Sequence, residues 1–101
     1  MGAGGRPGVI STEARPKLAS KVRLRYDRRG ERYMLLWPER GMVLNPTATE
    51  IVKLCTGDAT VADIADQLGA KYPTQPRDVL EHQLVEFLTS MADRGLMDGT
   101  R

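Results

Sequence analysis

Residues 35–46 read Leu-Leu-Trp-Pro-Glu-Arg-Gly-Met-Val-Leu-Asn-Pro. The apolar run before the Pro-Glu-Arg-Gly segment and the shorter run after it predict two strands joined by a hairpin turn. The Asn-Pro pair at the end introduces a helical pattern. We therefore expect a short last strand, Met42–Leu44, that has a partner on one side only. Such a strand leaves one edge of the sheet open.

The residues around this stretch predict the rest of the sheet. Over Val22–Tyr26, apolar residues alternate with Arg, as in an antiparallel strand with one buried face. The second strand is expected over about Glu31–Trp37. If Trp37 faces the core, Met34 and Leu36 point to the face that carries the arginines of the first strand. A covered second face and two shallow surface positions both fit this pattern.

Two short helices are expected after the sheet. Thr47 and Glu50 have the spacing of a capping box, which predicts a helix start near Thr47. Thr60-Val61-Ala62-Asp63 repeats this start signal with a shorter acid. Gly57 and Gly69 are expected to end these two helices in the left-handed conformation.

The third helix is expected to be the longest. Pro76 fits its first turn and Arg94-Gly95 fits its end, after which Leu96 and Met97 fold back onto the bundle. Its apolar stripe consists of Val79, Leu80, Leu84, Phe87, Leu88 and Met91. The elements together predict an α+β fold, a small winged helix-turn-helix-like domain in which a three-stranded antiparallel sheet precedes three helices.

Length and composition predict one domain. The chain has 101 residues, 41% of them hydrophobic, which is enough for a modest core. Residues 1–15 contain few large apolar side chains, so we expect a flexible arm there and a single domain over residues 16–98. The chain has neither the apolar core of a signal peptide nor a run of membrane-spanning length. We therefore expect a cytoplasmic protein without a membrane partner.

The charges are unevenly distributed. The first 40 residues carry ten Lys or Arg and four Asp or Glu, whereas the rest of the chain carries five basic and nine acidic residues. A winged-helix domain invites comparison with DNA-binding proteins, but the expected third helix has four carboxylates and only two arginines. Its own field opposes contact with phosphates. A winged-helix nucleic-acid-binding protein is therefore the alternative, and we expect no nucleic-acid partner.

The sequence offers little for catalysis. Cys55 lies on the apolar stripe of the first helix and is expected to be a buried structural residue. His82 lies beside the apolar stripe of the third helix and is expected at the surface. One Cys and one His cannot form a zinc site. No phosphate-binding glycine motif is present. We expect a binding protein that is not an enzyme and holds no metal or cofactor.

An open sheet edge can bind an extended peptide, which supplies main-chain hydrogen bonds while its alternate side chains enter pockets. The long helix would form the second wall of a groove, although its apolar residues also suit a core. Arg40 suits a carboxylate on a peptide or a partner, and equally a solvated turn. The candidate peptide-binding residues are Arg40, Met42, Val43, Leu44, Leu84, Leu88 and Met91. The same edge and the arm could also pair or exchange strands between two copies, so monomer and homodimer both remain open.

Several segments resemble one family. They are Arg15–Leu18, Val22–Asp27, Leu35–Gly41, Leu44-Asn45, Glu50–Gly57, Phe87-Leu88 and Gly95-Leu96. Over about residues 15–98 the chain resembles the PqqD family of pyrroloquinoline quinone (PQQ) biosynthesis. The Leu-Leu-x-Pro-Glu-Arg-Gly segment followed by Leu-Asn is the most specific part, with Trp37 where Tyr is more usual.

The resemblance implies a peptide chaperone, similar to the recognition elements of ribosomally made and modified peptides (RiPPs). Such proteins bind a precursor peptide and present it to a radical S-adenosylmethionine (SAM) enzyme, which joins its Glu and Tyr side chains. The family's groove would lie between Met42–Leu44 and the helix face with Leu84, Leu88 and Met91. The iron–sulfur clusters belong to the partner enzyme, so the resemblance also implies no cofactor in this chain.

Overall fold

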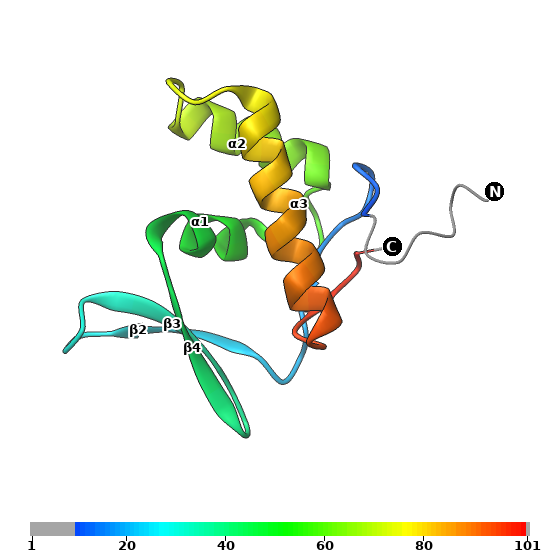
Figure 1. Ribbon diagram of the computed structural model, residues 1–101. Coiled ribbons are helices and arrows are strands. Elements are labelled where there is room, and N and C mark those ends of the chain that lie inside the picture. Colours follow the sequence, from blue (N-terminus) through cyan, green and yellow to red (C-terminus); the bar gives the residue numbers. More distant parts are fainter. Residues whose placement is uncertain (1–9, 101) are drawn as a thin grey trace.

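The computed structural model describes residues 10–100. In chain order the elements are β1 (Lys17–Leu18), β2 (Arg23–Asp27), β3 (Arg32–Trp37), β4 (Arg40–Leu44), α1 (Pro46–Leu54), α2 (Val61–Lys71), α3 (Arg77–Asp93) and β5 (Met97–Asp98). A three-stranded antiparallel sheet precedes three helices, which confirms the predicted α+β fold (Figure 1). Within the described range, no helix is both long and apolar enough to cross a membrane.

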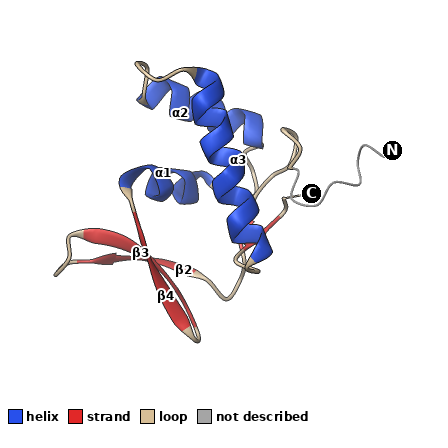
Figure 2. Cartoon of the chain, viewed as in Figure 1, coloured by secondary structure: helices blue, strands red, loops and turns tan. Residues whose placement is uncertain are grey.

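The larger sheet has β3 in its centre and β4 at one edge. Trp37 pairs with Arg40, so that Pro38 and Glu39 form a two-residue turn. The register places Tyr33, Leu35 and Trp37 of β3 on the same face as Met42 and Leu44 of β4. Helix α1 contacts β3 and β4 and lies over this face (Figure 2). The face therefore forms one side of the core, with Leu35 and Leu44 buried.

The opposite face of the sheet carries the second set of β3 residues. Met34 lies between Arg25 and Val43, and Leu36 lies between Arg23 and Gly41. This arrangement confirms the prediction that Met34 and Leu36 share a face with the arginines of the first strand. Helices α1, α2 and α3 all lie on the other side of the sheet (Figure 1). Among the residues described, none of the helices covers this second face.

Helix α1 begins earlier than predicted. Asn45 is its N-cap, and the Asn45 side-chain oxygen accepts a hydrogen bond of 2.7 Å from the Ala48 N–H. Pro46, which has no N–H to leave unpaired, occupies the first helical position. The prediction that Thr47 caps the helix was wrong because the stronger Asn-Pro start precedes it. Gly57 has the expected positive φ of 90°, but it lies beyond the end of the helix at Leu54.

Helix α2 has the predicted capping box. The Asp63 N–H donates to the Thr60 hydroxyl, and the Asp63 carboxylate accepts from the Thr60 N–H, each at 3.0 Å. Gly69 does not end this helix, because the chain stays helical to Lys71 and the Tyr72 N–H donates to the Leu68 carbonyl. Glycine in a helix interior costs about 1 kcal/mol relative to alanine. The burial of Ile64, Ala65 and Leu68 on α2 offsets this cost, so the helix continues through Gly69.

Helix α3 ends as predicted, with Gly95 at a positive φ of 74°. Pro76 is the N-cap of this helix and not a residue of its first turn. Val79, which the apolar stripe placed in the core, is exposed. Leu96 and Met97 are buried, and Met97 pairs with Leu18 in a two-stranded sheet of β1 and β5. The sequence predicted the return of the chain but not this second sheet.

The segment before β1 is packed against α2. Ile10 and Ala14 are buried, and the carbonyls of Thr12 and Ala14 accept hydrogen bonds from the N–H groups of Ala62 and Val61. These bonds satisfy backbone donors at the start of α2. Part of the segment expected as a flexible arm, residues 10–15, is therefore ordered by contacts. Residues 1–9 lie outside the described range, and the division at residue 15 stays a prediction.

An ion pair joins α1 to the end of α2. Lys71 Nζ lies 2.8 Å from Glu50 Oε1. The hydrogen bond lowers the pKa of Glu50 and raises the pKa of Lys71. A lowered carboxyl pKa gives a stabilisation that is present above the ordinary Glu value and lost as the pH falls through the folded-state value. A raised Lys pKa gives a stabilisation that is present at pH values below the ordinary Lys pKa. This stabilisation is lost as the pH rises through the folded-state pKa.

We expect Glu50→Gln to lower the melting temperature at about pH 7, and the difference from the wild type to shrink toward about pH 3. At the lower pH the wild-type carboxylate is also being protonated. The effect will be small, because the Lys71 side chain is half exposed and solvent screens the pair. Thermal denaturation followed by circular dichroism measures it, with Glu81→Gln on α3 as the control. A difference that does not change with pH would contradict the expectation.

Candidate functional site

Strand β4 presents an unpaired backbone edge. A two-residue turn is closed by a hydrogen bond that the N–H of its last flanking residue donates to the carbonyl of its first. Here these residues are Arg40 and Trp37. Backbone groups alternate in direction along an antiparallel strand. Met42 therefore pairs with β3 as Arg40 does, whereas the N–H and C=O groups of Gly41 and Val43 point outward. The register thus identifies which peptide groups of the edge are free.

This edge is accessible to a ligand. In residues 10–100, β3 is the only strand that pairs with β4. The side chains of Arg40 and Val43 are exposed, and Met42 is half-buried. No carboxylate of the described residues forms an ion pair with Arg40. The edge therefore offers main-chain hydrogen-bonding groups next to a free guanidinium.

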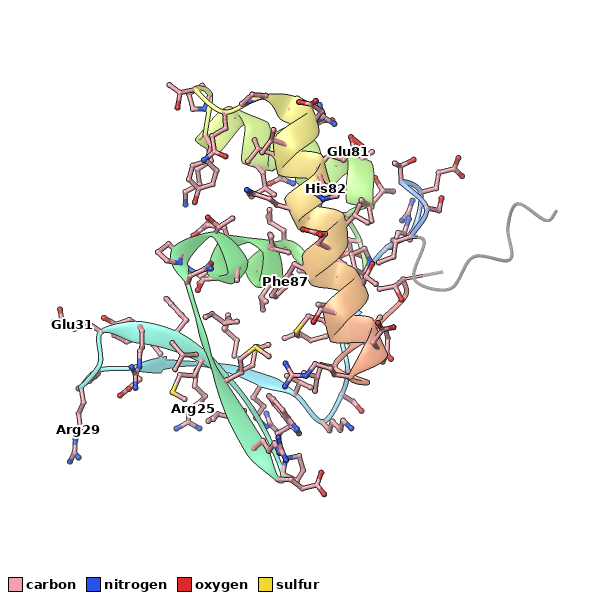
Figure 3. The ribbon with its side chains drawn as sticks, in the orientation of Figure 1. Arg25, Arg29, Glu31, Glu81, His82 and Phe87 are labelled. Carbon is pink, nitrogen blue, oxygen red and sulfur yellow. The ribbon has the colours of Figure 1, made fainter. Side chains whose placement is uncertain are left out.

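A groove of about 460 Å³ lies where the chain passes from β4 into α1. Helix α3 forms its other side, and Phe87 of α3 lies toward α1 (Figure 3). The lining residues are Asn45, Thr47, Ala48, Ile51, Gln83, Glu86 and Phe87. Ile51 and Phe87 supply apolar surface, while Asn45, Gln83 and Glu86 supply hydrogen-bonding groups. Such a mixture suits a side chain that is anchored by apolar contact and oriented by polar groups.

The structure divides the predicted site residues into two groups. Arg40, Met42 and Val43 lie at the edge with accessible side chains. Leu44 and the three α3 residues Leu84, Leu88 and Met91 are instead buried, with at most 4% of their surface exposed. The α3 residues that line the groove lie one or two residues from Leu84 or Leu88 in sequence, on the adjacent side of the helix. The helix face expected in the groove therefore belongs to the core.

Phe87 is the groove residue that could be recognised from the sequence. It belonged to the predicted stripe of α3 but is only half-buried, so part of the ring remains accessible. Gln83 lies one helical turn before it and Glu86 precedes it, so the three share one side of the helix. Gln83 and Glu86 were not predicted to line a groove, because polar residues on a helix usually indicate a solvated surface.

The two residues considered for chemistry lie outside this groove. Cys55 is buried as predicted, and its burial raises the pKa of the thiol to about 12. The thiol is therefore protonated at neutral pH and a poor nucleophile. His82 is at the surface as predicted, and its Nε2 lies 3.4 Å from the Glu86 carboxylate. Across residues 10–100, no group of three or more His, Cys, Asp or Glu is arranged to hold a metal ion.

A match to a protein-family model identifies the family of this chain. The family model for coenzyme PQQ synthesis protein D (PqqD) matches residues 32–97, which include the β4 edge and the groove. The chain belongs to the PqqD family. This confirms the resemblance noted in the sequence. A relative from Bradyrhizobium diazoefficiens, named PqqA binding protein, is 35% identical over 99 residues, which cover 98% of this chain and 95% of the relative.

Two solved structures share the fold. One is a solution structure of the PqqD truncation of Methylobacterium extorquens PqqCD, described as a functional, stand-alone RiPP recognition element. It has a TM-score of 0.78 and 32% identity, and the match covers 91% of this chain and 97% of that one. The other is TbiB1 in complex with the TbiA(beta) leader peptide, with a TM-score of 0.72, 22% identity, and 84% and 98% coverage. At that identity, the second similarity shows the fold alone.

Proposed function

We propose that this chain binds the ribosomally made PQQ precursor peptide by strand addition at the β4 edge. It then presents the peptide to a radical SAM enzyme, which joins a Glu and a Tyr side chain of the peptide. The observation that carries the proposal is the free edge at Gly41 and Val43 beside the groove between α1 and α3. Relatives named PqqA binding protein support the choice of ligand.

Under this proposal, the backbone of the edge provides affinity, and the side chains of the groove provide selectivity. Main-chain groups of the peptide pair with the outward groups of Gly41 and Val43, which gives affinity with little dependence on sequence. Peptide side chains that point toward α1 enter the groove, where Phe87 and Ile51 provide apolar contact. The exposed Arg40 guanidinium suits a peptide carboxylate, which it can bind through two parallel hydrogen bonds. Selectivity then comes from the groove and from Arg40.

The chain contributes recognition and not bond making. The buried Cys55 thiol, with its pKa raised to about 12, does not line the groove, and His82 is at the surface. Under the proposal, the cross-linking chemistry and its iron–sulfur clusters belong to the partner enzyme. The domain would raise the local concentration of peptide at that enzyme, as any linked binding module does.

The rival hypothesis is nucleic-acid binding by the winged-helix arrangement. Helix α3 would have to serve as the recognition helix, yet Arg77 at its start is paired with Asp66 at 2.6 Å. The remaining charges of α3 are Asp78, Glu81, Glu86 and Asp93. Such a helix repels phosphates, so contact with a duplex would fall to the basic strands alone.

Calorimetric titrations at two salt concentrations distinguish the two functions. We expect the precursor peptide to bind with an affinity that changes little with salt, because main-chain pairing and apolar contacts dominate. Phosphate binding would weaken log-linearly and steeply as salt rises. Sedimentation beforehand identifies a concentration at which the chain is monomeric, since self-pairing at β4 would compete with the peptide. Tight, salt-dependent binding of duplex DNA without peptide binding would overturn the proposal.

A further inference from the structure

The sheet face that points away from α1 forms a second surface, here called the outer face. Its apolar part consists of Met34, Leu36 and Val43, and its basic part consists of Arg23 and Arg25. Arg25, Met34 and Val43 are register partners across the three strands. In Figure 3 the Arg25 side chain projects from the sheet on the side away from α1.

The apolar part of the outer face is continuous and accessible. Val43 and Leu36 are 49% and 36% exposed, and Met34, which lies two residues before Leu36 on β3 and opposite Val43, is half-buried. Leu36 also lies over the backbone of Gly41, since a Cβ built there would come within 2.8 Å of Leu36 Cδ2. The leucine therefore extends the apolar surface across β4 to the edge of the sheet.

Arg23 and Arg25 on this face are uncompensated. Neither Arg23 nor Arg25 forms an ion pair with a carboxylate of residues 10–100. Asp27, the acidic residue on the same face, is already bound to Arg32 at 3.4 Å. Two free guanidinium groups therefore stand beside an exposed aliphatic strip. An apolar centre with Arg at its margin is a composition favoured at protein–protein interfaces.

The charges of the outer face indicate which kind of molecule binds there. A second copy docked symmetrically would bring its own Arg23 and Arg25 to the same surface, and the like charges would repel. Nucleic acid would neutralise the guanidinium groups but leave the aliphatic side chains without apolar partners. A folded protein in which apolar side chains are surrounded by Asp and Glu satisfies both parts. The observations therefore favour an acidic protein partner.

The outer face is also continuous with the peptide edge. Val43 contributes its side chain to the outer face and its free backbone groups to the edge. A peptide added at β4 extends the sheet by one strand, so every second peptide side chain would lie beside Val43 on the outer face. A partner docked there would contact this domain and the bound peptide together.

We infer that the outer face docks the enzyme that modifies the bound peptide, through an apolar contact surface on the enzyme that is surrounded by carboxylates. This inference rests on the proposed function and adds the surface and the charge of the partner. Peptide and enzyme then bind the same sheet at the same time, the peptide at the β4 edge and the enzyme on the outer face.

The test compares two outer-face variants in two binding assays. Arg23→Glu with Arg25→Glu forms one variant and Leu36→Asp another, and binding of the precursor peptide and of its radical SAM enzyme is measured for each. We expect the peptide dissociation constant to stay within about twofold, while that for the enzyme rises at least about tenfold with slower association. The control, Arg15→Glu with Lys17→Glu, makes the same change of charge outside the larger sheet and should alter neither constant.

The outcomes separate the inference from the proposed function. Normal peptide binding with undiminished enzyme binding in both outer-face variants would overturn the inference and leave the proposed function intact. Failure of the wild type to bind the peptide would instead remove the proposed function, and the inference with it. Tight binding of duplex DNA that the double arginine variant loses would assign the outer face to nucleic acid.

A zero-length cross-link tests the acidity of the partner surface. Arg25→Lys keeps the positive charge and adds an amine, which a carbodiimide couples to a neighbouring carboxylate with loss of water. We expect mass spectrometry to find an amide between position 25 and an Asp or Glu of the enzyme. The absence of such a link in a complex that still forms would contradict docking at this face.

Discussion

Val43→Pro is expected to fold normally and to lose the precursor peptide. The Val43 N–H points outward at the free edge of β4, so proline there removes a bond to the peptide and none to β3. Proline is tolerated at sheet edges for this reason. We expect the affinity for the peptide to fall at least about tenfold, which corresponds to about 1.4 kcal/mol. Circular dichroism and thermal denaturation measure whether the variant folds, and calorimetric titration measures its affinity for the peptide.

Met42→Pro is the matched contrast one residue away. Its N–H points toward Leu35 of β3, so proline there breaks the pairing of the two strands and should damage the fold. Val43→Thr keeps both the N–H and the β-branched shape, and should bind the peptide normally. If Val43→Pro keeps a native spectrum and binds the peptide as tightly as the wild type does, strand addition at this edge is wrong.

Leu88→Ala is expected to cause one of the largest losses of stability available in α3. The Leu88 side chain is fully buried within the core, and replacing such a leucine by alanine costs about 2–5 kcal/mol. For a domain of this size, the melting temperature should fall by roughly 10 °C or more. The affinity of the remaining folded protein for the peptide should change little, because Leu88 does not line the groove.

Phe87→Ala should reduce peptide affinity strongly and stability only slightly. Phe87 is half-buried and lines the groove, so its removal should weaken peptide binding more than it lowers stability. We expect about a tenfold loss of affinity with a smaller shift in melting temperature than for Leu88→Ala. Titrations below both melting temperatures make the comparison. A stable Leu88→Ala variant with weakened peptide binding would restore Leu88 as a peptide contact and contradict this division of α3.

The fold could be predicted where local chemistry determines it. The alternation of apolar and polar residues predicts strands β2 and β3 and the sheet face to which Leu36 points. The reciprocal hydrogen bonds of Thr60 and Asp63 require only a spacing of three residues. Of the candidate site, only the free edge was predictable in this way. The edge follows from a short last strand after a tight turn, so the location of Val43 needed no tertiary information.

Other features depend on contacts that have no local signature. Strands β1 and β5 are two residues each and pair across most of the chain, so neither produces a recognisable alternation. Ile10 looked like part of a flexible arm, because the surface that buries it belongs to distant elements. In α3, the apolar stripe is wide enough to leave its orientation open over a range that includes both Leu88 and Phe87. Packing against the neighbouring helices determines which of these two is buried.

The pairing of β1 with β5 has a consequence for how this domain can be attached to other objects. Lys17 lies opposite Asp98, and the first described residues and the C-terminal strand lie together, away from β4 (Figure 1). The described part of the chain therefore begins and ends on the same side of the molecule. A sensor surface or a second polypeptide attached on that side would leave the β4 edge facing solution.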